Sequence, residues 1–405
     1  PEGLRWPRAA GVPCRREEAF GRGLNPPLDS LNILVNMEKK QKARNHAFDI
    51  LCGICIVRMV TLHIMTLTGQ RDQVWWQEVM QWTYYFMSFF FFKAGYFCRS
   101  VGGRNRAYLI DRSQRLLAPY LSSAFIGLLV YFSFYYPLKN KYGHFVEDIS
   151  WSQLYKTSGV YGNTPIWFLF SFFCMYVVAH FTEKVRYLRW VWALGPLMSW
   201  WLWTQGNPLY MSVNNVFMGL FFFYLGHMWH WAMEKFGDRR MLLFSTVLVV
   251  AAAVGNVLLP GQYAMSSNTF TGHSLMAVVN ATLALCGLSG ILLATHVRRV
   301  PWLCYIGEHS MVYFLLHYPM LYFYKFTHLC FGRGIYRHPD DAIILIPVIF
   351  CICSWLVPYV EQLPWLSGRW GKPNPARVAA ASAPQPSAEP AREKMPAQDE
   401  AVPNK

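Results

Sequence analysis

Charged residues are scarce in this sequence, and acidic ones are the scarcest. Only 15% of the 405 residues are charged, with 22 acidic against 37 basic side chains, whereas 54% are hydrophobic and 17% aromatic. So few charges cannot cover a soluble chain of this length, and the composition indicates a membrane protein. The basic excess stands mostly in short segments between apolar runs, as in proteins that contact a lipid bilayer, so we expect no nucleic-acid partner.

Several kinds of site are also missing from the pattern. No spacing of His, Cys, Asp and Glu suggests a metal site, and no glycine-rich phosphate loop follows a strand. The ten cysteines fall mostly within apolar segments, which excludes a secreted disulfide framework. Cys52-Gly-Ile-Cys55 has redox-motif spacing but lies inside an apolar run, so we interpret it as small helix-packing residues. We expect no metal and no permanently bound cofactor.

The apolar residues gather in ten segments long enough to cross a bilayer. We therefore predict an all-α fold, a polytopic membrane protein with about ten transmembrane helices. Basic residues precede the first segment and follow the second, fourth, sixth and eighth, which predicts that both termini are cytoplasmic. The segments are 48–68, 80–98, 117–136, 164–182, 188–204, 210–232, 241–259, 274–296, 304–324 and 342–363.

Both ends of the chain are expected to lie outside the membrane domain. Residues 1–36 are rich in Arg, Gly and Pro and lack the apolar core of a signal peptide. We expect them to be a non-native or disordered leader, with Met37, the first methionine, as the true start. Residues 371–405, rich in Ala and Pro, are expected to form a disordered cytoplasmic tail. The transmembrane domain is thus predicted over 37–370.

The first apolar segment holds three ionisable residues, Asp49, Arg58 and His63. Each costs about 2.5–3.5 kcal/mol in hydrocarbon, so each is a functional candidate. On a helix, Asp49 and His63 lie roughly 40° apart on one face and about 21 Å apart in depth. Arg58 lies about 140° around the helix from His63, so it is not on the face shared by Asp49 and His63 unless the helix bends. Its side chain is expected to pair with a neighbouring helix.

Two layers of polar groups follow from the predicted topology. An inner cationic layer suits a phosphorylated donor, and an outer imidazole layer suits proton transfer. Two alternatives stay open: Lys93 reaches the membrane interface, and His317 is a satisfied core histidine. The inner layer comprises Lys93, with Arg58 and Arg115, and the outer layer His63 and His317.

At these residues the chain resembles acyltransferase family 3, bacterial membrane acyltransferases that modify cell-envelope sugars. The order of the similar stretches, each weak alone, gives the resemblance its specificity. These are FDILCGICIVRMVTLH (Phe48–His63), FFFFKAGYF (Phe89–Phe97), RLLAPYL (Arg115–Leu121), TPIWFLFSFF (Thr164–Phe173) and YIGEHSMVYFLLHYP (Tyr305–Pro319).

The resemblance implies transfer of an acyl group, usually acetyl from acetyl-CoA, to a hydroxyl of a glycan or lipid-linked acceptor. The enzyme would lie in the bacterial inner membrane. His63 takes the place of the family's essential histidine, as general base or as acyl carrier. Asp49 would orient that helix. The expected donor-binding residues are Lys93, Arg58 and Arg115, and the expected substrate-binding residues are His317, Trp167 and Glu308.

The chain departs from the family at Cys52, which stands where the family has a basic residue eleven positions before its histidine. Lys93 is the residue we expect to supply the missing cation, or else Arg58 does so after local rearrangement. A further alternative is that this copy is inactive or uses another donor. Two rival functions therefore stay open: a transporter that exports a glycan or its precursor, and an inactive scaffold among glycan-assembly proteins.

Overall fold

The computed structural model describes residues 46–98, 105–138, 151–182, 185, 191–330 and 339–370. The predicted leader, 1–36, and the predicted tail, 371–405, lie outside the described residues.

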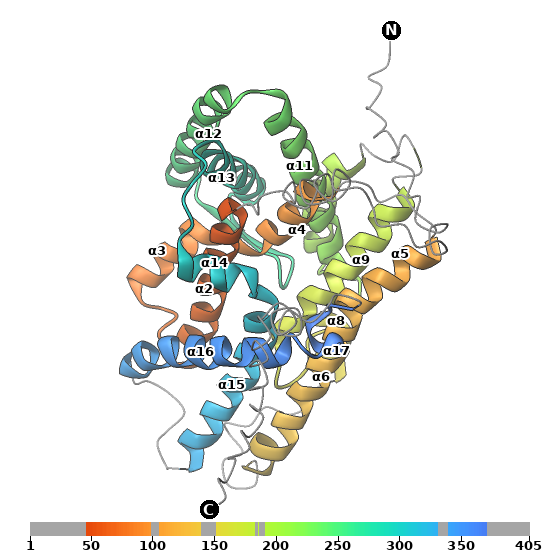
Figure 1. The fold of residues 1–405 in the computed structure, drawn as a ribbon, viewed down its shortest axis with the longest axis vertical. Coiled ribbons are helices and arrows are strands. Elements are labelled where there is room, and N and C mark those ends of the chain that lie inside the picture. Colours follow the sequence, from red (N-terminus) through yellow and green to blue (C-terminus); the bar gives the residue numbers. More distant parts are fainter. Residues whose placement is uncertain are drawn as a thin grey trace, which may run out of the picture. The chain divides into compact units, whose positions relative to one another are not determined.

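The described part of the chain is predominantly helical, as predicted (Figure 1). One two-stranded hairpin stands among the helices, and turns of π and 3₁₀ type join or extend several of them. The longer elements are α2 (His46–Leu67), α3 (Val74–Thr83), α4 (Phe86–Tyr96), α5 (Asn105–Arg112), α6 (Ala118–Val130), α8 (Trp151–Thr157), α9 (Trp167–Thr182), α10 (Gly195–Thr204), α11 (Asn214–Lys235), α12 (Asp238–Leu258), β1 (Gly261–Ala264), β2 (Thr269–Gly272), α13 (Ser274–Ala294), α14 (Pro301–Glu308), α15 (Ser310–Cys330), α16 (Pro339–Val360) and α17 (Pro364–Ser367).

Six helices of the described residues are long and apolar enough to cross a membrane. They coincide with the first, third, fourth, seventh, eighth and tenth predicted segments. Two further helices, α11 and α15, have 22 and 21 residues but more polar sequences. The number ten stays a prediction. The six are His46–Leu67, Asn105–Leu138, Thr164–Thr182, Asp238–Leu258, Ser274–Ala294 and Asp341–Val360.

The second and fifth predicted segments differ from single spans. The segment 80–98 is divided between α3 and α4, because the chain leaves the α-helix at Tyr84 and Tyr85. α10 has only ten residues, about 15 Å of helix, which is half the thickness of a hydrocarbon core. These elements therefore contribute to the membrane domain without each crossing it as one straight helix.

α2 lies within the helical domain, in contact with α4, α13, α14, α15 and α16 (Figure 1). Two glycines bring α14 against its backbone. A Cβ atom built on Gly307 would lie 1.9 Å from the carbonyl oxygen of Asp49, and one on Gly53 would lie 2.3 Å from that of Leu303. The interpretation of the Cys52–Cys55 stretch as helix-packing residues therefore holds at Gly53.

The hairpin β1–β2 replaces what the sequence presents as an uncharged loop between α12 and α13. Tyr263 and Phe270 face each other across the strands, with ring centroids 4.6 Å apart. Buried Asn268, at φ +46°, tethers the turn, because its Nδ2 donates to the carbonyl of Ser199 at 3.0 Å and to Oδ1 of Asn207 at 2.6 Å. The hairpin is thereby fixed to α10 and to the loop before α11.

Candidate active site

A cavity of about 310 Å³ lies beside the second half of α2. Its walls come from α2 (Arg58, His63), from the α2–α3 connection and α3, from the start of α4, and from Trp167 of α9. Gln262 to Ser266, from β1 and the hairpin turn, complete it. All of these elements meet at the end of α2 that the topology prediction places outside.

His63 lies in this cavity next to two aromatic residues of α15. Its ring centroid is 5.3 Å from that of His317 and 5.1 Å from that of Tyr318. His63 is half-buried, whereas His317 is fully buried. The structure therefore brings together the two imidazoles that the sequence predicts in one layer.

The tautomer of His317 follows from its hydrogen bonds. Nδ1 lies 2.9 Å from the carbonyl oxygen of Tyr313 and 3.0 Å from that of Phe314. Because both partners only accept, Nδ1 carries the proton, and the neutral ring keeps a lone pair on Nε2. Nε2 is buried and has no hydrogen-bond partner among the described residues. The backbone carbonyls thus fix the orientation of the His317 ring, with Nε2 as a hydrogen-bond acceptor that has no partner among the described residues.

Arg58 lines the same cavity, although the helical wheel places it off the stripe of His63. Its Nε donates to Oγ1 of Thr83 at 3.1 Å, which is the predicted pairing with a neighbouring helix. Its guanidinium carbon lies 4.1 Å from the ring centroid of Phe86. The helix need not bend, because the long side chain carries the charge to α3 and α4.

The remaining predicted site residues are spread over the molecule. Trp167 is buried and lines the cavity. Asp49 is buried at the other end of α2, against Gly307 of α14. Glu308 faces Arg299, with 3.6 Å between Oε1 and Nη2. Asp49 and Glu308 therefore do not line the cavity that holds His63.

The two other predicted cations also lie outside the cavity. Lys93, half-buried in the last turn of α4, is within electrostatic range of Cys55, one turn after Cys52. Arg115 is about half exposed and donates from Nε to Asp111 at 2.7 Å. Neither lines the space around His63.

Comparison with known families identifies the chain. The model of the acyltransferase domain (acyltransferase family 3) matches residues 45–363. The chain belongs to this family. Neither the curated proteins nor the solved structures contain a match. The protein is therefore a multi-pass membrane acyltransferase in general terms, and among its described residues no group of His, Cys, Asp and Glu forms a metal site.

The cavity residues that sequence reasoning missed in this acyltransferase come from the hairpin. Gln262, Tyr263 and Met265 cover the cavity, yet they carry no charge and stand in a connection without one. A signal was present, because Ser-Ser-Asn between a tyrosine and a phenylalanine is typical of a turn between two strands. Charge counting alone indicates only an uncharged connection between two apolar segments here.

At the opposite end of α2 the acyltransferase has a closed ionic cluster. His309 Nδ1 lies 2.6 Å from one carboxylate oxygen of Glu361, and Arg369 Nη1 donates to the other at 2.6 Å. Burial raises the pKa of Glu361, but the bonds and charges of His309 and Arg369 outweigh it and hold the pKa below its ordinary value. Each carboxylate oxygen of Glu361 therefore has a charged or polar partner.

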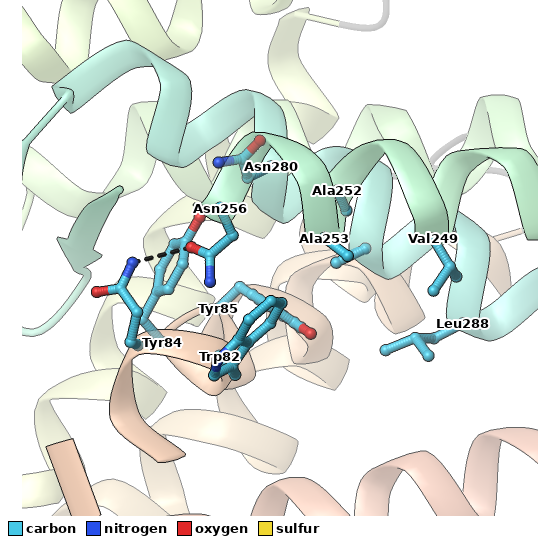
Figure 2. A pocket seen from close by; sticks show the side chains of 11 residues that line it. Trp82, Tyr84, Tyr85, Val249, Ala252, Ala253, Asn256, Asn280 and Leu288 are labelled. Carbon is cyan, nitrogen blue, oxygen red and sulfur yellow. Dashed lines mark hydrogen bonds between the residues drawn. The ribbon is translucent and has the colours of Figure 1, made fainter. Parts of the chain in front are cut away.

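A second cavity, of about 190 Å³, lies between α3, α12 and α13 (Figure 2). Tyr84 lines both cavities, and its hydroxyl donates to the carbonyl of Ala277. The second cavity is apolar except for amides and tyrosine hydroxyls. Asn256 accepts from Gln81 Nε2 at 2.9 Å, whereas both side-chain polar atoms of buried Asn280 have no hydrogen-bond partner among the described residues.

Proposed function

We propose that the protein is an O-acyltransferase of the bacterial inner membrane. It would transfer an acetyl group from acetyl-CoA to a hydroxyl of a cell-envelope glycan or lipid-linked precursor. The observation that supports this best is the pair His63 and His317, in which backbone carbonyls fix one tautomer beside a cavity of substrate size. A histidine oriented by a second group is the arrangement that general base catalysis needs.

The proposed chemistry follows from the proton positions. In the proposed reaction, a neutral His63 would turn its N–H to the open Nε2 of His317 when substrate binds, and it would then present its other nitrogen as a base. That nitrogen takes the proton of the acceptor hydroxyl while the oxygen attacks the thioester carbonyl. The new C–O bond forms, the C–S bond breaks, and the protonated imidazole returns its proton to the leaving thiolate. His63 as a transient acyl carrier is the alternative route.

Topology supports acceptor entry from outside. The cavity is lined by residues at the predicted outer ends of α2 and α9 and by the hairpin that follows α12, while the basic segments stand at the predicted inner ends. The donor would approach from the cytoplasm. Lys93 and Arg115 remain the proposed partners of its phosphates, with Lys93 taking over from the cation that Cys52 cannot supply.

The test is acyl-CoA turnover by the purified full-length protein in lipid, with an extract of envelope glycan precursors as acceptor. We compare the wild type with His63→Ala and Lys93→Ala. Turnover lost in both supports the enzyme and assigns Lys93 to the donor. Loss only with His63→Ala supports the enzyme but points to another donor cation. Turnover unaffected by His63→Ala contradicts the mechanism, and movement of the precursor across the membrane without acyl transfer favours the transporter.

A further inference from the structure

Arg58 is a buried cation that forms no ion pair with any of the described residues. It is 7% exposed, and its Nη1 atom is buried with no hydrogen-bond partner among the described residues. Thr83 and the rings of Phe86 and Trp76 solvate part of the guanidinium but carry no negative charge. An arginine held in a membrane domain is costly unless an anion compensates it.

The same cavity holds a second cation and no acid. Arg71, exposed in the α2–α3 connection, lines the mouth and lies within electrostatic range of Arg58. None of the described residues that line the cavity is acidic. Two like charges facing one space repel each other, and a bound anion would relieve both the repulsion and the open Nη1 donor.

We infer that this cavity binds an anionic acceptor, and that Arg58 contacts a phosphate or carboxylate group of it. The inference rests on the proposed function, because it takes His63 as the site of reaction. Arg58 and His63 stand about 7.5 Å apart along the axis of α2, both line the same cavity, and their side chains lie within electrostatic range of each other although they leave the helix at different angles. The anionic group therefore lies about one sugar ring from the hydroxyl that is acylated.

The short separation of His63 and Arg58 indicates that the anion belongs to the acceptor and not to the acyl-CoA donor. In acyl-CoA the whole pantetheine arm stands between the thioester and the diphosphate, which is longer than the separation of His63 and Arg58. A sugar phosphate or an acidic sugar carries its anion close to its hydroxyls. Arg58 thus belongs to the acceptor, in place of the donor role that the sequence suggested.

The experiment measures binding, by equilibrium dialysis, to the full-length protein in lipid nanodiscs. The probes are radiolabelled glucose 1-phosphate, its neutral counterpart methyl glucoside, and coenzyme A. The variants are Arg58→Gln, Arg58→Lys and His63→Ala, with Arg239→Gln as the control that removes an exposed arginine outside the cavity.

We expect the wild type to bind glucose 1-phosphate more tightly than methyl glucoside. Arg58→Gln should weaken the phosphate probe at least about tenfold, Arg58→Lys should restore part of the affinity, and Arg239→Gln should have no effect. Coenzyme A should bind equally to all variants. His63→Ala should keep the binding of the sugar phosphate, so a failure of the catalytic proposal leaves this result unchanged.

Three results would overturn the inference. They are no binding of glucose 1-phosphate by the wild type, equal binding of the neutral sugar, and affinity unchanged by Arg58→Gln. Loss of coenzyme A binding alone in Arg58→Gln would instead return Arg58 to the donor.

Discussion

His63 and His309 both stand in polar clusters around α2, at opposite ends of it, and the two clusters differ in how their atoms are satisfied. Around His309, both oxygens of Glu361 are occupied. Around His63, Nε2 of His317 and Nη1 of Arg58 have no partner among the described residues. Leaving a buried polar atom unpaired costs free energy, and because these two atoms lie beside the cavity that holds His63, we interpret them as positions for a substrate. The first cluster stabilises the fold, and the second is the candidate for chemistry.

The largest effect should come from His63→Ala. Removing a general base lowers turnover by about 10²–10⁴-fold. Because the half-buried ring of His63 lies at a cavity wall, its loss should affect packing less than the loss of a fully buried side chain. Acyl-CoA turnover measures the loss of catalysis, and thermal unfolding in detergent measures the loss of stability. The matched variant His309→Ala should do the reverse, lowering the unfolding temperature while leaving turnover of the folded protein nearly intact. Equal effects of the two variants on turnover would contradict the assignment of a catalytic role to His63 and a structural role to His309.

Glu361→Gln tests the closed cluster. Losing the charge at two charge-assisted bonds should destabilise the fold by about 1.5–3 kcal/mol at neutral pH. Since the folded pKa of Glu361 is below its ordinary value, the carboxylate's contribution is complete above that ordinary value and is lost as the pH falls through the folded pKa. Unfolding temperatures of wild type and variant should therefore differ at pH 7 and converge at acidic pH. A constant difference between pH 7 and pH 3 would refute the assignment.

Sequence reasoning located the helices better than it located their neighbours. The period of α2 predicts that Asp49 and His63 share one face; the structure covers the Asp49 end with α14 and leaves the His63 end beside a cavity. Periodicity gives angle and depth on one helix and says nothing about the partner helix. For the same reason Arg58 was set apart from His63, although its long side chain brings its charge to their common cavity.

The hairpin and the divided second segment were less accessible to prediction. Apolar length alone cannot show that a helix breaks at Tyr84 and Tyr85, because these residues are as apolar as their neighbours. Nor does charge counting detect a hairpin held by Asn268, whose partners Ser199 and Asn207 are 69 and 61 residues away in sequence. Such contacts are set by tertiary structure, which single-segment patterns do not contain.

His317→Phe should have a smaller effect than His63→Ala. Phenylalanine keeps a ring but removes Nε2, the proposed acceptor for His63, which should lower turnover roughly 3–10-fold. Nitrogen-15 NMR of labelled histidines gives a readout that packing would not change. The His63 signal, assigned by its absence in His63→Ala, should report one tautomer in the wild type and a mixture in His317→Phe. A single tautomer in both would show that His317 does not orient His63.

The smallest effect is expected in the second cavity. There the side chain of Asn256 has a hydrogen bond, whereas that of Asn280 has none among the described residues. Asn280→Leu removes two buried atoms that have no hydrogen-bond partner among the described residues. Because Asn280 also lines a cavity that can take part of the larger side chain, the variant should stabilise the protein or leave it unchanged, by at most about 1 kcal/mol. Asn256→Leu is the matched control: it removes the acceptor of Gln81 and should lose about 0.5–1.5 kcal/mol. Thermal unfolding measures both, and turnover should stay within about twofold in Asn280→Leu. If Asn280→Leu is the more damaging of the two, the second cavity holds a bound molecule on Asn280, and unpaired atoms then mark ligand positions in both cavities.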